Sequence, residues 1–104
     1  MIKFVGAGPG DPELVTIKGK KALEEAEVVL YTGSLIPKEV LSWCSNNALI
    51  VNSANMDYDD IFNFFLEHHH QNMVRLHTGD PSIYSTIAKQ IEFLKHKNIA
   101  YEVI

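Results

Sequence analysis

The chain alternates short apolar runs with longer stretches in which apolar residues recur every three or four positions. We predict β-strands in the five runs that are rich in β-branched and aromatic residues. These runs are Ile2–Val5, Val28–Tyr31, Ala48–Val51, Met73–Leu76 and Tyr101–Ile104. Their nearly continuous apolarity is typical of strands that are buried on both faces, as in a parallel sheet.

The stretches between these runs predict helices, because their apolar residues follow the 3.6-residue helical period. Three stripes carry this signal: Leu14, Ile17 and Leu23; Ile61, Phe64 and Phe65; and Ile83, Ile87, Ile91 and Leu94. A short helix with proline in its first turn is predicted over Pro37–Cys44, and Asp57 is a plausible N-cap of the helix after it. The alternation predicts an α/β fold: an open, mainly parallel five-stranded sheet with flanking helices.

In open sheets of this kind, ligands bind just beyond the carboxyl ends of the strands. Function is therefore expected in the loops Gly6–Glu13, Thr32–Ile36, Asn52–Asn55 and His77–Ser82. The glycines of the first loop permit positive φ angles and let backbone amides approach a ligand closely.

A nucleotide site is disfavoured in the first loop. The dinucleotide fingerprint G-x-G-x-x-G would need glycine where Asp11 stands, and an acidic residue at the end of the second strand, where Tyr31-Thr32-Gly33 is found. No Gly-Lys-Ser/Thr follows at the spacing of a phosphate-binding P-loop, and the carboxylate of Asp11 would repel an anion.

Gly-Asp-Pro occurs twice, at 10–12 and at 79–81, each time between a predicted strand and a predicted helix. Aspartate as N-cap and proline at the first helical position explain either occurrence alone. Capping does not require glycine ahead of aspartate at both sites. Capping alone and capping combined with contact to a ligand that carries a cationic amine both remain open.

The composition argues against nucleic-acid and membrane partners. The chain has 104 residues and a net charge of −4, so it is one domain without the basic excess typical of nucleic-acid binding. Cys44 is the single cysteine, which excludes an internal disulfide and fits a cytoplasmic protein. No apolar stretch is long enough for a transmembrane span, so no membrane partner is expected.

Histidines offer weak chemical signals. His68, His69 and His70 are consecutive, and consecutive helical positions point about 100° apart, so we expect structural or solvated roles and no metal site. His68 continues the apolar stripe of Ile61, Phe64 and Phe65 and is expected at the solvent-exposed edge of that stripe. His77 stands at a strand end, where a hydrogen bond to the loop backbone is at least as plausible as proton transfer.

Two long segments resemble one family. Residues 5–14, Val-Gly-Ala-Gly-Pro-Gly-Asp-Pro-Glu-Leu, resemble the opening motif of the tetrapyrrole methylases, the S-adenosylmethionine-dependent enzymes of corrin and sirohaem synthesis. Residues 75–84, Arg-Leu-His-Thr-Gly-Asp-Pro-Ser-Ile-Tyr, resemble the second signature of the family. Residues 31–37 and 52–56 look most like the branch of precorrin-4 and cobalt-precorrin-4 C(11)-methyltransferases.

The resemblance implies a site and a reaction. It places Pro9, Thr78, Gly79, Asp80, Ile83 and Tyr84 beside S-adenosyl-L-methionine, and Gly8, Gly33 and Ser34 beside a precorrin or cobalt-precorrin substrate. It implies direct transfer of a methyl group to a ring carbon in cobalamin biosynthesis, with no catalytic acid, base or nucleophile assigned. The full-length family is expected to be homodimeric.

The chain stops in the fifth predicted strand, where the family continues into a second α/β domain that completes the cofactor cleft. Residues 1–104 therefore resemble the amino-terminal domain alone, which we expect to be inactive or nearly so in isolation. A non-catalytic binding or assembly module that uses the same strand-end loops is the alternative. Calorimetric titration with S-adenosylhomocysteine distinguishes the two.

Overall fold

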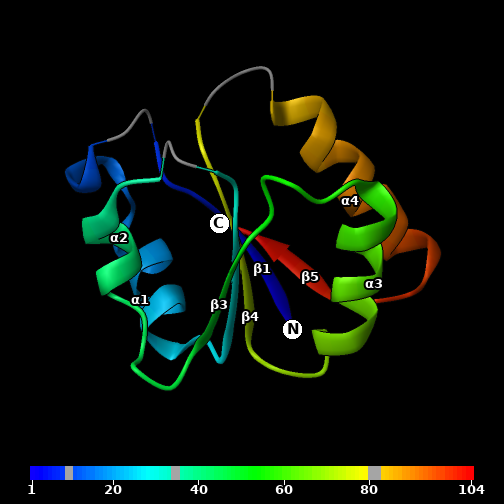
Figure 1. Ribbon diagram of the computed structural model, residues 1–104, viewed down its shortest axis with the longest axis horizontal. Helices are drawn as coiled ribbons and strands as arrows, with labels where there is room; N and C mark the ends of the chain where they lie inside the picture. The colour runs from blue at the N-terminus through cyan, green and yellow to red at the C-terminus, as the bar shows by residue number, and fades with distance from the viewer. Residues whose placement is uncertain (9–10, 34–35, 80–82) are drawn as a thin grey trace.

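The computed structural model describes residues 1–8, 11–33, 36–79 and 83–104 (Figure 1). Its described residues form one parallel sheet whose strands lie in the order β3-β2-β4-β1-β5. The strands are β1 (Ile2–Gly6), β2 (Val28–Tyr31), β3 (Leu49–Asn52), β4 (Met73–His77) and β5 (Tyr101–Val103). The α/β prediction is confirmed, and each observed strand lies within a residue or two of the predicted one.

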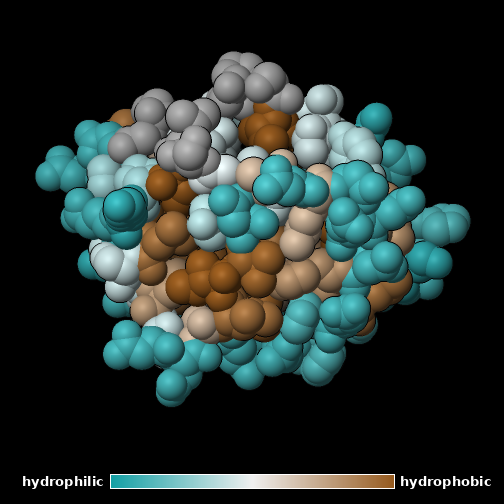
Figure 2. All heavy atoms as spheres, viewed as in Figure 1, coloured by the Kyte–Doolittle hydropathy of each residue, from teal (hydrophilic) through white to brown (hydrophobic). Residues whose placement is uncertain are grey.

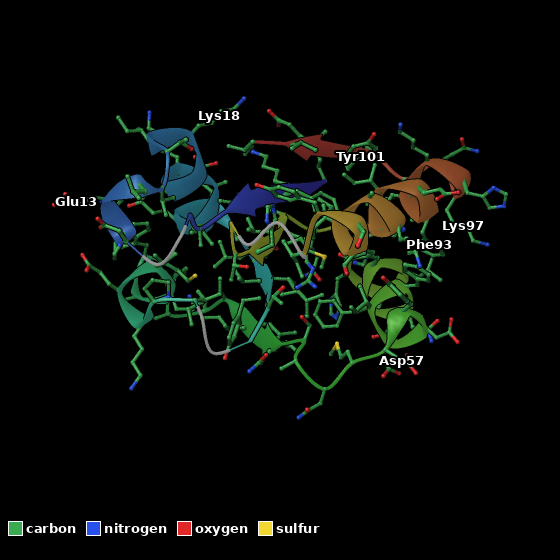
Figure 3. The ribbon with its side chains drawn as sticks, turned by 90° about the horizontal axis from the view of Figure 1, so that it is seen from above. Glu13, Lys18, Asp57, Phe93, Lys97 and Tyr101 are labelled. Atoms are coloured by element: carbon green, nitrogen blue, oxygen red, sulfur yellow. The ribbon has the colours of Figure 1, made fainter. Side chains whose placement is uncertain are left out.

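Helices cover both faces of the sheet. A short 3-10 helix, η1 (Pro12–Leu14), lies with α1 (Ile17–Glu25) and α2 (Lys38–Ser42) on one side, and α3 (Tyr58–His68) lies with α4 (Tyr84–His96) on the other (Figure 1). Figure 3 shows the same layers from above, with Glu13 and Lys18 on one side of the sheet and Asp57 and Phe93 on the other.

The core consists of two clusters, one on each face of the sheet. The cluster under α1 and α2 is made of apolar side chains, among them Val5, Leu23 and Leu76. The cluster under α3 and α4 also contains aromatic rings. Phe4 lies edge-on to Phe65, at 6.3 Å between ring centroids. The strands supply both clusters because successive side chains point to opposite faces.

Capping explains where the helices begin. Asp57 caps α3, as predicted: its side chain accepts from the amide of Asp60, whose side chain accepts in turn from the amide of Asp57. Asp11 caps η1, with Pro12 at the first helical position. Pro37 lies one residue before α2 rather than inside its first turn.

The predicted stripe of Leu14, Ile17 and Leu23 is wrong for two of its members. Leu14 is 58% exposed and Ile17 is 76% exposed, whereas Leu23 is fully buried. Thr16 caps α1 by accepting from the amide of Gly19, and extended backbone at Val15 separates η1 from α1. Leu14 is therefore separated from α1 by extended backbone, whereas Ile17 lies in α1 but six positions before Leu23, about 120° away around the helix.

Strand β3 also departs from its prediction of burial on both faces. Leu49 is 47% exposed and Ile50 is 40% exposed, because the strand order places β3 at an edge of the sheet. Figure 2 shows apolar residues gathered on the face of the molecule over this edge. None of the helices in the described part of the chain is long and apolar enough to cross a membrane.

Candidate functional site

The parallel strands bring the loops that follow them to a single edge of the sheet. The amide of Ala7, after β1, donates to the carbonyl of His77 at 2.7 Å. On the other side of β4, the amide of Thr32 donates to the carbonyl of Leu76 at 3.2 Å. The loops after β1 and β2 therefore lie on either side of the loop after β4 at one edge of the sheet.

Gly8 and Gly79 make the closest approach between two of these loops. The amide of Gly79 donates to the carbonyl of Gly8 at 3.0 Å. A Cβ added at Gly79 would stand 3.2 Å from the carbonyl carbon of Gly8, which is tighter than ordinary packing. Gly8 also has a φ of +71°, a left-handed conformation that glycine adopts without strain. This junction therefore depends on two glycines, one from each resembling motif.

Gly33 is held by a residue that the sequence interpretation did not single out. Its φ is +68°, and its amide donates to Oδ1 of Asn52 at 3.1 Å. The same oxygen accepts from the amide of Ala54 at 2.9 Å. Asn52 follows a predicted strand directly, and asparagine side chains often bond to nearby backbone in turns. This position in the sequence was the signal from which a turn contact of Asn52 could have been predicted.

His77 fastens its own loop. Its Nδ1 lies 3.0 Å from the carbonyl of Thr78, which fits a protonated Nδ1 that donates to this oxygen. Burial lowers the pKa of His77; the carbonyl of Thr78 opposes this shift and the positive charge of Arg75 adds to it. The predicted hydrogen bond to the loop backbone is therefore present. Thr78 itself is buried beside it.

Arg75 lies beneath this edge and is 1% exposed. Its Nε donates to Oε1 of Gln90 at 3.0 Å, and its Nη1 donates to the carbonyl of Leu30 at 3.3 Å and to Oγ of Ser53 at 2.9 Å. These three acceptors are neutral, and burial lowers the pKa of Arg75 to about 10. The sequence motif includes Arg75, but periodicity alone could not reveal that an arginine within a strand is buried.

The other predicted site residues are placed only in part. Ile83 precedes α4 and packs partly against the core, while Tyr84 begins α4 and is largely exposed. Pro9, Ser34 and Asp80 lie outside the described residues. The structure thus brings together Gly8, Thr78 and Gly79, and places Gly33 beside Asn52.

Two residues outside this edge, His68 and Cys44, make structural contacts, and such a role was expected for His68. The ring of His68 lies 4.5 Å from the ring of Phe64 between centroids, tilted by 43°, and its Nδ1 lies 3.0 Å from Oε1 of Gln71. Cys44 is partly buried against the α1 and α2 cluster, and burial raises the pKa of its thiol. Within residues 1–8, 11–33, 36–79 and 83–104, no three His, Cys, Asp or Glu side chains gather as metal ligands would.

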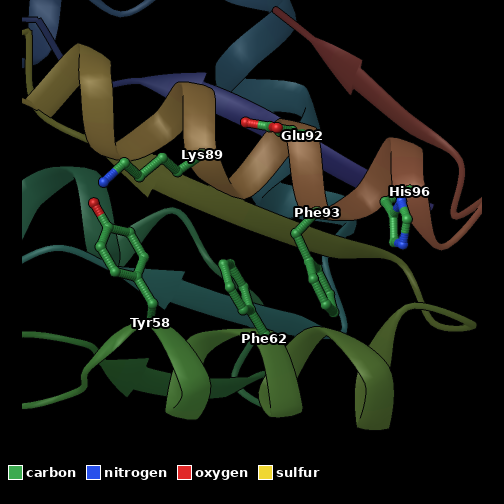
Figure 4. A pocket seen from close by; sticks show the side chains of 6 residues that line it. All are labelled: Tyr58, Phe62, Lys89, Glu92, Phe93 and His96. Atoms are coloured by element: carbon green, nitrogen blue, oxygen red, sulfur yellow. The ribbon is translucent and has the colours of Figure 1, made fainter.

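A separate groove of about 440 Å³ lies between α3 and α4 (Figure 4). Phe62 and Phe93 stack at 4.1 Å between ring centroids, Tyr58 stacks on Phe62 at 5.9 Å, and the ammonium of Lys89 lies 5.1 Å from the centre of the Tyr58 ring. The rings of the groove contact one another, and its lining includes none of the strand-end glycines.

The fold and the edge define a class of protein: a parallel α/β domain whose glycine-rich loops meet at the carboxyl ends of the strands. The comparison with protein families then identifies the family. The chain belongs to the tetrapyrrole (corrin/porphyrin) methylases, which it matches over residues 1–104.

Individual relatives agree with this assignment. The chain is 53% identical over 103 residues to a cobalt-precorrin-4 C(11)-methyltransferase of Methanocaldococcus jannaschii, a match that covers 97% of this chain and 40% of the relative. The X-ray structure of a cobalt precorrin-4 methyltransferase superposes with a TM-score of 0.89 at 35% identity, over 99% of this chain and 44% of that one.

A further solved structure is a complex with a small molecule. The uroporphyrin-III C-methyltransferase of Thermus thermophilus, complexed with S-adenosylhomocysteine, matches with a TM-score of 0.78 at 34% identity, over 99% of this chain and 43% of that one. The chain thus spans less than half the length of these relatives.

Proposed function

We propose that this chain is the amino-terminal part of an S-adenosylmethionine-dependent methyltransferase that methylates a ring carbon of a precorrin or cobalt-precorrin. The observation that carries the proposal is the junction of Gly8 with Gly79, which joins the two family motifs at the carboxyl edge of the sheet. Ligands of open parallel sheets bind at this edge.

The proposed cofactor residues are Pro9, Thr78, Gly79, Asp80, Ile83 and Tyr84, and the proposed substrate neighbours are Gly8, Gly33 and Ser34. The described members fit an extended organic ligand. A Cβ built on Gly33 meets no atom of the other described residues within 4 Å, its chain neighbours aside, and Tyr84 is largely exposed. Backbone groups of the two glycine loops can approach such a ligand without side chains in between.

S-adenosylmethionine supplies a methyl group that its positive sulfur has already activated for attack by a ring carbon. The chain therefore needs no nucleophile of its own, and its contribution is to hold donor and acceptor in line and in near contact. The hydrogen bonds that fix Gly8 to Gly79 and Gly33 to Asn52 support this role, because the first joins the loops after β1 and β4 and the second joins the loop after β2 to the end of β3.

The rest of the proposal concerns the whole protein. A second domain would complete the cofactor cleft and the substrate trough, and the whole enzyme would be a homodimer. The exposed apolar side chains of Leu49 and Ile50 support contact of the β3 edge with another domain or subunit.

Calorimetric titration with S-adenosylhomocysteine tests the function. We expect weak or undetectable binding by residues 1–104, and clear binding once the remaining length of the relatives is joined to the chain. In that longer protein, Gly79→Val should reduce the affinity at least about tenfold, because its side chain would separate the two loops.

Matched controls locate the site. Lys89→Ala and His96→Ala, both in the groove between α3 and α4, should leave the affinity unchanged. Failure of the longer protein to bind S-adenosylhomocysteine would contradict the methyltransferase proposal and favour a binding or assembly module. Loss of binding in the groove variants alone would move the site away from the strand-end loops.

A further inference from the structure

The buried guanidinium of Arg75 joins three parts of the molecule that are distant in sequence. It bonds to Leu30 in β2, to Ser53 directly after β3, and to Gln90 in α4. Gln90 is fully buried, and its Nε2 has no partner among the residues that the structure describes. A strand, a loop and a helix are thus tied to one side chain of β4.

Ser53 carries this connection to the edge of the sheet. Its Oγ accepts from Arg75 and donates to the carbonyl of Tyr31 at 3.1 Å, while its amide donates to the same carbonyl at 2.8 Å. The preceding residue, Asn52, holds the amide of Gly33. Hydrogen bonds therefore fix Ser53 to Arg75 and to Tyr31, and the peptide bond joins Ser53 to Asn52, whose side chain fixes Gly33.

The burial of Arg75 makes this arrangement specific. A guanidinium is planar and directs its N–H groups in fixed directions, so its acceptors must lie at set positions. A buried donor that loses its acceptor retains the full cost of desolvation. Displacement of Ser53 or Gln90 would therefore leave a buried cation with too few acceptors, which opposes movement of the loop after β3.

We propose that Arg75 is a positioning residue: through Ser53 it fixes the junction of Asn52 with Gly33, and through Gln90 it fixes α4 relative to the loop at Thr78 and Gly79. This inference rests on the proposed function, since it assigns to a buried side chain the alignment of the proposed substrate and cofactor loops. Arg75 itself lies beneath the site and is not a catalytic residue.

Ser53→Ala tests the inference, because it removes the hydroxyl that bonds to Arg75 and Tyr31 and leaves Asn52 and Gly33 intact. Amide hydrogen exchange of the 104-residue chain, measured without ligand, should become about five- to tenfold faster at Gly33 and Ala54, the size expected for one lost hydrogen bond. Ser53→Thr keeps the hydroxyl and should restore slow exchange.

Ser42→Ala is the matched control. The hydroxyl of Ser42 also bonds to a backbone carbonyl, that of Glu39, but on the opposite side of the sheet in α2. It should leave exchange at Gly33 and Ala54 unchanged. Unchanged exchange at these amides in Ser53→Ala would overturn the proposal, and so would an equal acceleration of all amides, which would show a merely structural role.

Arg75→Lys extends the test to the guanidinium itself. Lysine keeps the positive charge, but a single ammonium cannot occupy the positions of both Nε and Nη1. We expect the same local acceleration at Gly33 as in Ser53→Ala, and wild-type exchange there would contradict the proposal. Because exchange is measured without ligand, the result is independent of whether S-adenosylhomocysteine binds, so failure of this inference and failure of the proposed function are distinguishable.

Discussion

The two faces of the sheet are built from different chemistry. The face under α1 and α2 is closed by aliphatic side chains and by the close approach of Gly19 to β1. The face under α3 and α4 contains aromatic rings and, toward the carboxyl end of the strands, the polar group of Arg75, Gln90 and Ser53.

Because of this difference, we expect apolar contacts to determine the stability of the fold and the buried polar group to determine the positions of the strand-end loops. Apolar contacts are not directional, so they favour a compact face but do not fix the loops above it. Hydrogen bonds to a buried guanidinium require set positions, and those positions lie under the loops of the proposed site. Substitutions of buried apolar residues should therefore change the free energy of unfolding, whereas substitutions in the group of Arg75, Gln90 and Ser53 should also change amide exchange in the loops at the strand-end edge.

The largest effect is expected from Leu23→Ala on the apolar face. Leu23 is fully buried in the α1 and α2 cluster, so truncation loses transfer free energy and leaves a cavity. We expect a loss of about 2–5 kcal/mol in the free energy of unfolding, measured by urea denaturation. Leu14→Ala is the control, since Leu14 is largely exposed and should change it by less than about 0.5 kcal/mol. Equal losses in both variants would show that α1 does not pack as described.

A smaller loss is expected from Gly19→Ala. A Cβ at Gly19 would stand 2.9 Å from Cγ1 of Val5 and 3.1 Å from Oγ1 of Thr16. Alanine favours a helix over glycine by roughly 1 kcal/mol, but the collision requires α1 to move away from β1. We expect a net destabilisation of about 1–3 kcal/mol in urea denaturation.

A double-mutant cycle checks the cause of that loss. Val5→Ala removes the contacting Cγ1, so the two substitutions together should cost less than the sum of their separate effects. Strict additivity would show that the spacing of α1 from β1 is not what makes Gly19 necessary.

The fold was predictable because its signals are local. Apolar runs located the strands, and Asp57 predicted the start of α3. The exposure of β3 was not predictable, because only the strand order makes it an edge. Leu14 was assigned to the wrong face for a related reason: two extended residues, Val15 and Thr16, break the helical phase that the spacing suggested.

A still smaller loss of stability is expected from Gly33→Ala, at the strand-end edge of the sheet. A Cβ at this position meets no atom within 4 Å among the described residues beyond its chain neighbours, so the backbone φ of +68° is what opposes the substitution. We expect a destabilisation of about 1–2 kcal/mol in urea denaturation, with faster exchange at Ala54. Gly33→Asn is the control, because asparagine tolerates the left-handed region, as Asn98 does with a φ of 57°. An equal loss in both variants would contradict a purely conformational origin.

The site was predictable only as far as its glycines. Glycine-rich loops after strands indicated the edge, and Gly8 and Gly79 do meet there. An asparagine directly after a strand indicated a turn contact at Asn52, but its partner Gly33 and the partners of Arg75 could not be assigned, since they lie on other strands and on α4. Long-range hydrogen bonds leave no periodic trace in a single chain.

The smallest effect on stability is expected from His77, and it reports on Arg75 directly. Burial lowers the pKa of His77 in the folded protein, and the charge of Arg75 lowers it further. As pH falls below 6.5, the ordinary value, the unfolded chain binds a proton first, so stability decreases with falling pH until the pKa of the folded form is passed. His77→Gln should flatten this dependence, which urea denaturation at several pH values would measure.

Arg75→Met should raise the pKa of His77 in NMR titration, because it removes a positive charge, whereas Arg75→Lys should leave that charge in place. A pKa that did not respond to Arg75→Met would show that the guanidinium does not act electrostatically on the loop after β4, leaving only its hydrogen bonds to distinguish the two faces.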